Sequence, residues 1–597
     1  MNRYVTGEGF YFEPNYVIPV NTKPTLQIAR PDGTIRVNEP VSFALPSRPQ
    51  RTVYGILGMI QLLSGILLAS RSSLGPYLIV ITERKLACRF LGHYIWKVTG
   101  SDILPCGNGT NGLDSQQRAD EDKFVELLKT FLASDWIYYS STYDLTRSLQ
   151  SEVTSRHEKS FLRANLRFVV NRFIAAPFIQ VLEQRTDTRL EDFLVFCIEG
   201  CTRYHSRGID DKGNVSNFVE TEQIVLVDDD VASFVQIRGS IPLFWRQNIN
   251  IRYKPPFEFY NHASMTSVFE AHFKRLLEDY GQVTAVNLVN HRGWEGELAK
   301  MFAKQAREFS DPKMNYVPFD FNKQCPRMQW DRVSILLDQI EGEMSQQGWF
   351  TGRLERPHGD GQLSFTQISQ KQNGVVRTNC IDCLDRTNLV QGYLGRRILT
   401  LQLCHFGVLD KTETVQDFWA DNGDAVSRQY SGTGALKADF TRTGRRTKMG
   451  LVADGVNSMM RFFLNNFTDG KRQDAMDLFY GHYTVRLDNY YSPFIYRFDY
   501  QLLVSPAIMV ASFLVMFYLL LTSSLSAGTR LFMTLFVTFI FLFATMVFFN
   551  DGVRYVQYPR LRPPPVAAYA RPWASALADK QRKLFNAIDP SRKVHVI

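Results

Sequence analysis

Two long stretches towards the end of the chain are apolar on every side. Leu502–Leu521 and Leu531–Phe549 contain no charged residue, and each approaches the ~20 apolar residues that a helix needs to cross a bilayer. Because the apolar residues are not confined to one stripe, a hairpin buried in a soluble core is the weaker alternative. The pattern predicts transmembrane helices at 502–521 and 531–549, joined by a lumenal turn, Thr522–Arg530.

The residues before about 180 alternate short apolar runs with Gly, Asn and Asp turn signals, a pattern typical of strands. Val53–Ser70 is interrupted by three glycines and a glutamine, so we interpret it as buried strands and turns, not as a span. Gly107–Asp122 is mostly polar and is predicted to be a mobile loop. Residues 1–180 are therefore predicted to form a β-rich N-terminal domain.

Longer helical patterns follow. Ser264–Gly281 places apolar residues at helical spacing and ends in glycine, and Trp294–Phe309 is similar. Such helices mixed with strands predict an α/β catalytic domain over 181–483, and a juxtamembrane linker over 484–501. The expected fold class is thus α+β and α/β, with the transmembrane hairpin after it.

Charge places these parts relative to the membrane. Residues 550–597 carry nine Lys or Arg and three Asp, which is +6 of the chain's net +9. Basic residues next to a span favour the cytosolic side, so residues 1–501 and the basic tail 550–597 are both expected in the cytosol. A nucleic-acid partner is not expected, because it would require a basic folded domain.

The segment Arg377–Asn388, RTNCIDCLDRTN, concentrates reactive side chains. A short β-branched run precedes it, and Leu389, Val390, Tyr393 and Leu394 follow at helical spacing. The segment is therefore predicted to be a loop between a strand and a helix N-terminus. Such a loop attracts anions, because free N–H groups and the helix dipole both favour negative charge.

Cys380 and Arg386 form a C-x5-R pattern in this loop. At a helix N-terminus a cysteine thiolate is favoured, and it can attack phosphorus to form a phosphocysteine. Arg386 can hold two phosphate oxygens as charge builds up. A redox CxxC would leave Arg386 unexplained, and a zinc site needs four ligands. The remaining phosphate contacts are expected from Asn379, Ile381, Cys383, Leu384, Asp385 and Thr387.

Two acids in an anion-binding loop must be paired, turned away or protonated. A protonated Asp382 could donate to the leaving oxygen as general acid; bracing of the loop is the alternative for Asp382, and the favoured one for Asp385. Cys383 either captures an oxidised Cys380 as a disulfide or is a small buried residue. For Asp210 and Asp211, a turn is favoured over a metal site.

The segment Ser431–Lys448 has no apolar helical face and is predicted to be a loop. Two interpretations stay open: a solvated surface loop, or contact with anionic headgroups, which attract basic residues near a leaflet. The residues concerned are Lys437, Arg442, Arg445, Arg446 and Lys448.

RTNCIDCLDRTN resembles the signature of the Sac-domain phosphoinositide phosphatases, and the order of the other motifs and the membrane hairpin resemble their membrane-anchored branch. The similar motifs are Tyr138–Gln150, Arg207–Gln223, Ile237–Trp245 and Val286–Leu298. The resemblance implies a Sac N-terminal domain, a cysteine-phosphatase-like catalytic domain, no metal or other cofactor, and phosphatidylinositol monophosphates as substrates, with the 4-phosphate favoured. It favours Asp382 as the acid, and implies an endoplasmic reticulum or Golgi membrane.

Overall fold

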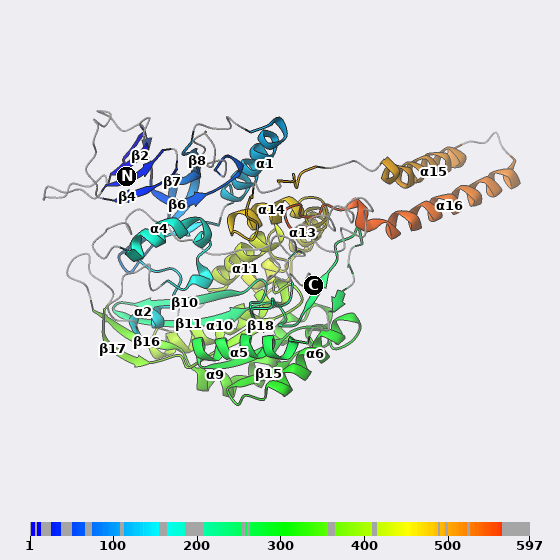
Figure 1. Cartoon of the computed structure of the whole chain (residues 1–597). Helices are drawn as coiled ribbons and strands as arrows, with labels where there is room; N and C mark the ends of the chain where they lie inside the picture. Colours follow the sequence, from blue (N-terminus) through cyan, green and yellow to red (C-terminus); the bar gives the residue numbers. More distant parts are fainter. Residues whose placement is uncertain are drawn as a thin grey trace.

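The fold is taken from a computed structural model. It describes residues 2–5, 9–13, 25–30, 32–37, 51–65, 75–107, 113–134, 136–154, 164–184, 205, 207–252, 255, 257–259, 263–355, 364–408, 415–486, 490–495, 500–521 and 526–563. Within these ranges two folded parts lie together, and a helical hairpin projects from them (Figure 1).

The N-terminal part contains two antiparallel sheets, as the alternating pattern predicted. The first has the order β4-β3-β2-β1-β5, with β1 Asn2–Val5, β2 Gly9–Glu13, β3 Leu26–Ala29, β4 Ile35–Val37 and β5 Arg51–Thr52. The second has the order β6-β7-β8-β9, with β6 Gly55–Ile60, β7 Tyr77–Phe90, β8 His93–Pro105 and β9 Tyr138–Tyr139. Within the described ranges, α1 Ser115–Leu132 and α4 Arg172–Gln184 pack on these sheets, whereas α2 Leu149–Thr154 packs on the second folded part.

The second part is built on a seven-stranded mixed sheet of order β15-β14-β18-β11-β16-β17, with β10 also paired to β11. Its strands are β10 Val219–Val227, β11 Asp230–Arg238, β14 Gln282–Asn287, β15 Met314–Pro318, β16 Phe350–Glu355, β17 Ser364–Gln370 and β18 Gly374–Asn379. β12 Trp245–Gln247 and β13 Phe257–Phe259 form a separate pair. Strands β15, β14, β18 and β11 run parallel, so their carboxyl ends meet at one edge.

Helices surround this sheet. They are α5 Met265–Tyr280, α6 Trp294–Phe309, α7 Phe321–Gln324, α8 Ser334–Gln339, α9 Glu341–Gln347, α10 Asp385–His405, α11 Val415–Ser431, α12 Ala438–Thr443, α13 Lys448–Phe467 and α14 Asp469–Phe479. The helices predicted at Ser264–Gly281 and Trp294–Phe309 are confirmed as α5 and α6. The first buries Phe269 and Phe273, and a Gly281 with positive φ ends it.

Two loop predictions are wrong in part. The loop predicted over Gly107–Asp122 is helical from Ser115, because Asp114 forms a reciprocal capping box with Gln117. The loop predicted over Ser431–Lys448 contains the short helix α12. In Val53–Ser70, β6 is fully buried, as interpreted from the sequence, while residues 66–70 lie outside the described ranges.

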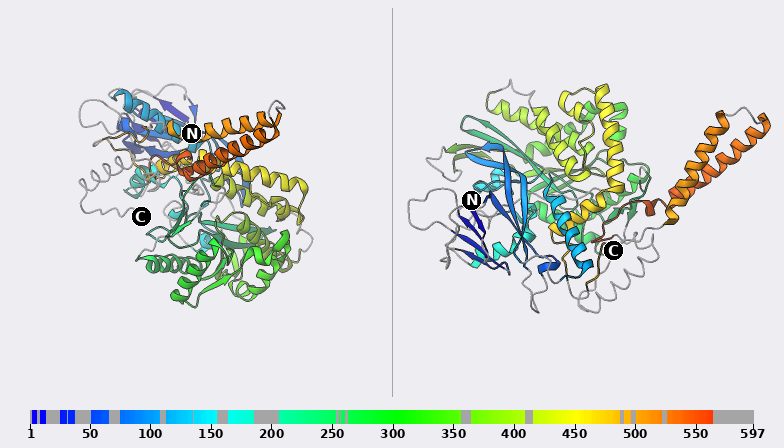
Figure 2. Two further views of the ribbon diagram at one scale, coloured as in Figure 1. Left: turned by 90° about the vertical axis from the view of Figure 1, so that its right-hand side faces the viewer. Right: turned by 90° about the horizontal axis from the view of Figure 1, so that it is seen from above.

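Helices α15 Val504–Leu521 and α16 Ala527–Asn550 lie at the predicted spans, and both are long and apolar enough to cross a membrane. They form the projecting hairpin (Figure 2). Residues 522–525 of the predicted turn, and the tail after 563, are outside the described ranges.

The chain returns from the hairpin onto the folded parts. Val556 packs with Ile249 and Ile251, and the Tyr558 hydroxyl donates to the Ile249 carbonyl at 2.8 Å. Further on, the backbone N–H groups of Arg560 and Leu561 donate to the buried carboxylate of Asp474 at 2.7 and 2.8 Å. The beginning of the predicted tail is therefore part of the fold.

The predicted linker also packs against protein. Tyr490 donates to Asp120 of α1 at 2.8 Å, and Phe494 lies against Phe124. Helix α14 packs on α1 within the same hydrophobic cluster, which joins residues on either side of the predicted domain boundaries. The boundaries at 180, 483 and 501 stay predictions.

Candidate active site

The loop that follows β18 lies where the carboxyl ends of three parallel strands meet. β18 pairs with β14 on one side and with the end of β11 on the other, and α10 begins at Asp385. The predicted strand–loop–helix arrangement is therefore confirmed. In open α/β sheets, ligands bind at such carboxyl ends.

Buried arginines fix this loop from beneath. Arg377 of β18 donates to the Ser240 carbonyl at 2.7 Å and to Asn379 at 3.1 Å. Arg238, at the end of β11, donates to the Cys383 carbonyl at 3.2 Å and also binds Asn388 and Gln391. Burial lowers the pKa of each of these two arginines to about 10. Both remain charged at neutral pH; Arg238 holds the loop at Cys383, and Arg377 joins the end of β18 to the segment after β11.

Cys380 is buried, with 3% of its surface exposed, at the first position of the loop. Cys383 is fully buried, has a φ of 51°, and its Sγ donates to the Gly239 carbonyl at 2.9 Å. Burial, followed by the nearby Cys380, raises the pKa of Cys383 to about 12. The Cys383 thiol is thus protonated and hydrogen-bonded to the residue that follows β11.

Arg386 is held by Glu295, at the start of α6. Its Nη1 and Nη2 atoms donate to the two carboxylate oxygens at 2.9 Å each, and Nη1 also donates to the Leu288 carbonyl at 3.1 Å. Glu295 in turn accepts from the Asn290 backbone N–H. Burial opposes the charge of Arg386, but Cys380 and Glu295 outweigh it, so the pKa of Arg386 is raised.

Asp382 is paired with Arg207, which precedes β10. The two side chains approach to 2.5 Å, and Arg207 also donates to the Ile381 carbonyl at 3.0 Å. Asn217 donates to the Asp382 carbonyl at 3.0 Å. Arg207 and Asn217, both from the Arg207–Gln223 motif, therefore hold the middle of the loop in place.

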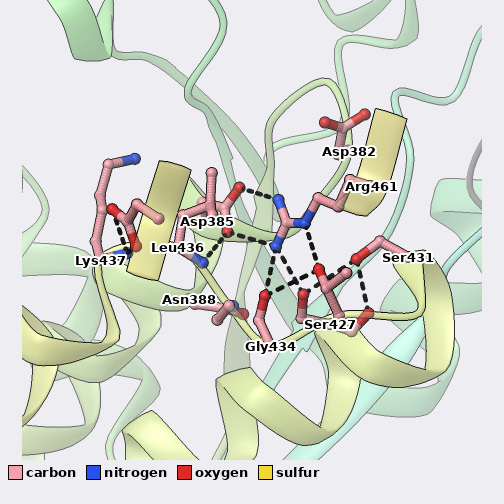
Figure 3. Close-up of polar contacts among 12 residues, drawn as sticks. Asp382, Asp385, Asn388, Ser427, Ser431, Gly434, Leu436, Lys437 and Arg461 are labelled. Carbon is pink, nitrogen blue, oxygen red and sulfur yellow. Dashed lines mark hydrogen bonds and ion pairs between the residues drawn. The ribbon is translucent and has the colours of Figure 1, made fainter. Parts of the chain in front are cut away.

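Asp385 takes part in a separate network (Figure 3). Arg461 of α13 donates to both of its carboxylate oxygens, at 2.8 and 3.2 Å, and the Leu436 N–H donates at 2.7 Å. Burial alone would raise the pKa of Asp385, but Arg461 outweighs it and the pKa is lowered. Its side chain braces the loop, as the favoured interpretation expected, while Asp382 stands apart from this network.

The other predicted phosphate contacts lie in or under the loop. Asn379 donates to Asn287 at 2.7 Å, and Leu384 packs against α11. Ile381 belongs to the core on the α5 side of the sheet. The buried Thr387 hydroxyl has no hydrogen-bond partner within the described ranges.

The predicted headgroup residues divide into three kinds. Lys437 lies by the loop, near Phe321 and Trp330, and burial lowers its pKa. Arg442 pairs with Asp421 and Asp424, and Arg446 with Asp439 and Asp454. Arg445 and Lys448 are exposed.

Asp210 accepts N–H bonds from Lys212 and Asn214, which is the predicted turn.

Sequence reasoning missed four of the residues that build this site. They are Arg207 before β10, Arg238 at the end of β11, Glu295 in α6 and Arg461 in α13. Arg207, Arg238 and Glu295 lie inside motifs that were recognised, so these motifs were the available signal. Arg461 interrupts the apolar run Met459–Leu464, where a lone arginine is itself a signal.

Comparisons with known proteins agree with this geometry. A family model described as the SacI homology domain matches residues 54–202 and 199–326. The phosphatidylinositol-3-phosphatase SAC1 of Drosophila melanogaster is 38% identical, over 94% of this chain and 97% of the relative. The phosphoinositide phosphatase SAC7 of Arabidopsis thaliana is 36% identical over 78% and 81%, and the phosphatidylinositol-3-phosphatase SAC1 of Saccharomyces cerevisiae is 32% identical over 90% and 89%.

The fly and yeast relatives are similar over 94% and 90% of this chain, and the resemblance inferred from the motifs is confirmed. The chain therefore belongs to the SAC1 family of phosphoinositide phosphatases, and its two apolar C-terminal helices fit the membrane-anchored branch of that family.

Proposed function

We propose that the protein hydrolyses the monoester phosphate of phosphatidylinositol monophosphates through a phosphocysteine, without a metal ion. The Cys380 thiolate attacks phosphorus, the bond from phosphorus to the inositol oxygen breaks, and that oxygen takes a proton. Water then cleaves the S–P bond and releases inorganic phosphate. The observation that carries the proposal is the Cys380–Arg386 pair in a strand–loop–helix, with Arg386 already oriented by Glu295.

The Glu295 contact leaves Arg386 able to bind phosphate. Glu295 and Leu288 use the donors at the end of the guanidinium. The Nε–H and the second Nη2–H form another fork on the side of the guanidinium, and a guanidinium fork matches two phosphate oxygens. Glu295 therefore supports a pre-oriented guanidinium, which costs less to order when the transition state forms.

Asp382 is proposed as the general acid. Its pair with Arg207 stabilises the ionised carboxylate, so the proton has to arrive together with the substrate. A phosphate dianion brings negative charge next to Asp382 and competes for Arg207, and both effects favour protonation. Bracing of the loop remains the alternative role.

For the substrate, we propose that the 4-phosphate is favoured. The SAC1 relatives from fly, fish and yeast are named for the 3-phosphate, so the two monophosphates must be compared directly. The hairpin base, packed on Ile249 and Ile251, supports action on the membrane that carries the enzyme. We propose an endoplasmic reticulum or Golgi membrane, with both termini cytosolic.

The test is phosphate release by the full-length protein in proteoliposomes, with each phosphoinositide in turn. Wild-type protein should act on monophosphates and keep its activity in EDTA. Cys380→Ser should abolish turnover while lipid binding survives, because a hydroxyl lacks the thiolate's nucleophilicity at neutral pH. Activity in the serine variant, or its loss in EDTA, contradicts the mechanism; binding without any turnover in the wild type indicates a non-catalytic lipid tether.

A further inference from the structure

Helix α13 carries a stripe of exposed apolar side chains along its whole length. The stripe residues recur at three- and four-residue intervals, so they share one face. More than half of each side chain is exposed, from 52% to 77%. They are Met449, Val452, Val456, Met459 and Phe463.

The opposite face of α13 is polar and faces the protein. Asp454 accepts the Lys437 backbone N–H at 3.1 Å and pairs with Arg446. Arg461 and Asn465 are buried, with 3% and 2% exposed. A surface helix in water turns its apolar stripe inwards and its polar face outwards. Helix α13 does the reverse: its apolar stripe is not covered by the residues that the structure describes.

The position of α13 relates this stripe to the membrane hairpin. The Asn466 carbonyl, near the helix end, accepts the Gln557 backbone N–H at 2.7 Å. Gln557 is only seven residues beyond Asn550, where α16 ends. In the right-hand view of Figure 2, α13 (yellow) lies on the side of the catalytic part that faces the hairpin.

We propose that the apolar stripe of α13 enters the interfacial layer of the bilayer that the hairpin spans. Methionine, valine and phenylalanine fit the boundary between headgroups and acyl chains. The exposed Arg445 and Lys448, at the start of the helix, suit the anionic headgroups next to them. The stripe belongs to a helix whose carboxyl end contacts the chain that leaves the hairpin at Gln557, so the bilayer is the occupant that the geometry favours over a second copy of the chain.

The polar face of α13 gives this contact a consequence, which rests on the function proposed above. Arg461 holds Asp385, five residues after Cys380, and Asp454 holds the backbone of Lys437 beside the same loop. One helix thus lies between the bilayer and the phosphate-binding loop. Insertion of its outer face sets the depth and orientation at which the loop meets a lipid headgroup.

The contact can be measured without any activity. A tryptophan placed at the stripe, Met459→Trp, should have its fluorescence quenched when the full-length protein is reconstituted with lipids brominated in the acyl chains. The matched control is Ile368→Trp, a half-exposed position on β17 at the end of the molecule far from the hairpin (Figure 1). The added fluorescence of Ile368→Trp should not be quenched. Equal quenching of the two, or none at Met459→Trp, overturns the proposal.

A second experiment separates this inference from the proposed function. The triple variant Val452→Ser, Val456→Ser, Met459→Ser should lose most of its turnover on bilayer phosphoinositide but keep that on a soluble short-chain one. Equal losses on both substrates contradict a membrane role for α13. Quenching in a protein without phosphatase activity leaves the helix contact standing and removes the function. If the triple variant instead converts a detergent-solubilised dimer to monomer, the stripe is a face between two copies, and the proposal fails.

Discussion

Glu295 binds both terminal nitrogens of Arg386 at 2.9 Å, although 91 residues separate the two in sequence. The contact joins the first turns of α6 and α10, the helices that follow the neighbouring parallel strands β14 and β18. The arginine that we propose to bind phosphate is therefore oriented by an acid from another motif.

Glu295→Gln should lower kcat/KM about 10- to 100-fold, because a charge-assisted hydrogen bond to Arg386 contributes about 1.5–3 kcal/mol. Steady-state kinetics on vesicles containing phosphatidylinositol monophosphate would measure this. Glu297→Gln is the control, since Glu297 is exposed and pairs only with Lys300 within the described ranges. Similar kinetics for the two variants would remove Glu295 from the site.

Arg386→Lys should be severely impaired although the charge is kept. Lysine is a point charge and cannot bind Glu295 with one fork and phosphate with another. We expect a larger fall in kcat than rise in KM, since the grip tightens in the transition state. Nearly full activity in the lysine variant would show that charge alone suffices.

Asp382→Asn should slow the hydrolysis of inositol lipids far more than that of an aryl phosphate. A phenolate leaves without a proton, whereas an inositol alkoxide needs one. Rates on the two substrates, compared with those of wild-type protein, provide the measurement. Equal losses would assign Asp382 to bracing the loop with Arg207.

Asp385→Asn should destabilise the protein by about 3–5 kcal/mol at neutral pH, because it leaves Arg461 buried without its charged partner. The pKa of Asp385 is lowered in the folded protein, so its stabilisation is complete above the unfolded pKa of about 4. It is lost as the pH falls through the folded value. Denaturant unfolding of both proteins in detergent from pH 7 to pH 3 should show the gap closing in acid; a constant gap would contradict the pairing.

The anchored enzyme should act mainly in cis. The linker packs on α1 through Tyr490 and Phe494, and the hairpin base packs on Ile249, so little free chain is left for reach. Two vesicle populations, one with enzyme and one with substrate alone, would test this. Trans hydrolysis as fast as cis, without vesicle fusion, is the result that would count against it.

The spacing of apolar residues, together with the turn residues between them, was enough to predict the strand and the helix that hold the site. The β-branched run before Cys380 became β18, and the helical spacing after Arg386 became α10. A local pattern contains this information because strand and helix periods are set by neighbouring residues. The same kind of signal was overlooked at Asp114, where an acid three residues before Gln117 starts a helix.

The partners of the loop could not be predicted in this way. Arg207, Glu295 and Arg461 reach it from three other elements, and these contacts depend on how distant segments pack. The role of α13 was hidden for a related reason: its apolar stripe is ordinary for a helix, and the sequence does not say which face points outwards. The burial of Arg461 and the exposure of Met459 show which face of α13 points outwards.

The chain after α16 returns to the folded parts and binds Asp474 of α14. Asp474 accepts the N–H groups of Arg560 and Leu561, and burial raises its pKa to about 7. The hairpin is therefore attached to the folded parts on both sides, by Tyr490 and Phe494 before it and by the chain from Val556 to Leu561 after it. Removing the hairpin with the chain that follows it would remove these later contacts. A soluble enzyme made by stopping ahead of Val504 would lose those donors and leave a carboxyl group without its bonds. Kinetic constants measured on such a fragment would then describe a destabilised protein. They should be compared with those of the full-length protein in a membrane.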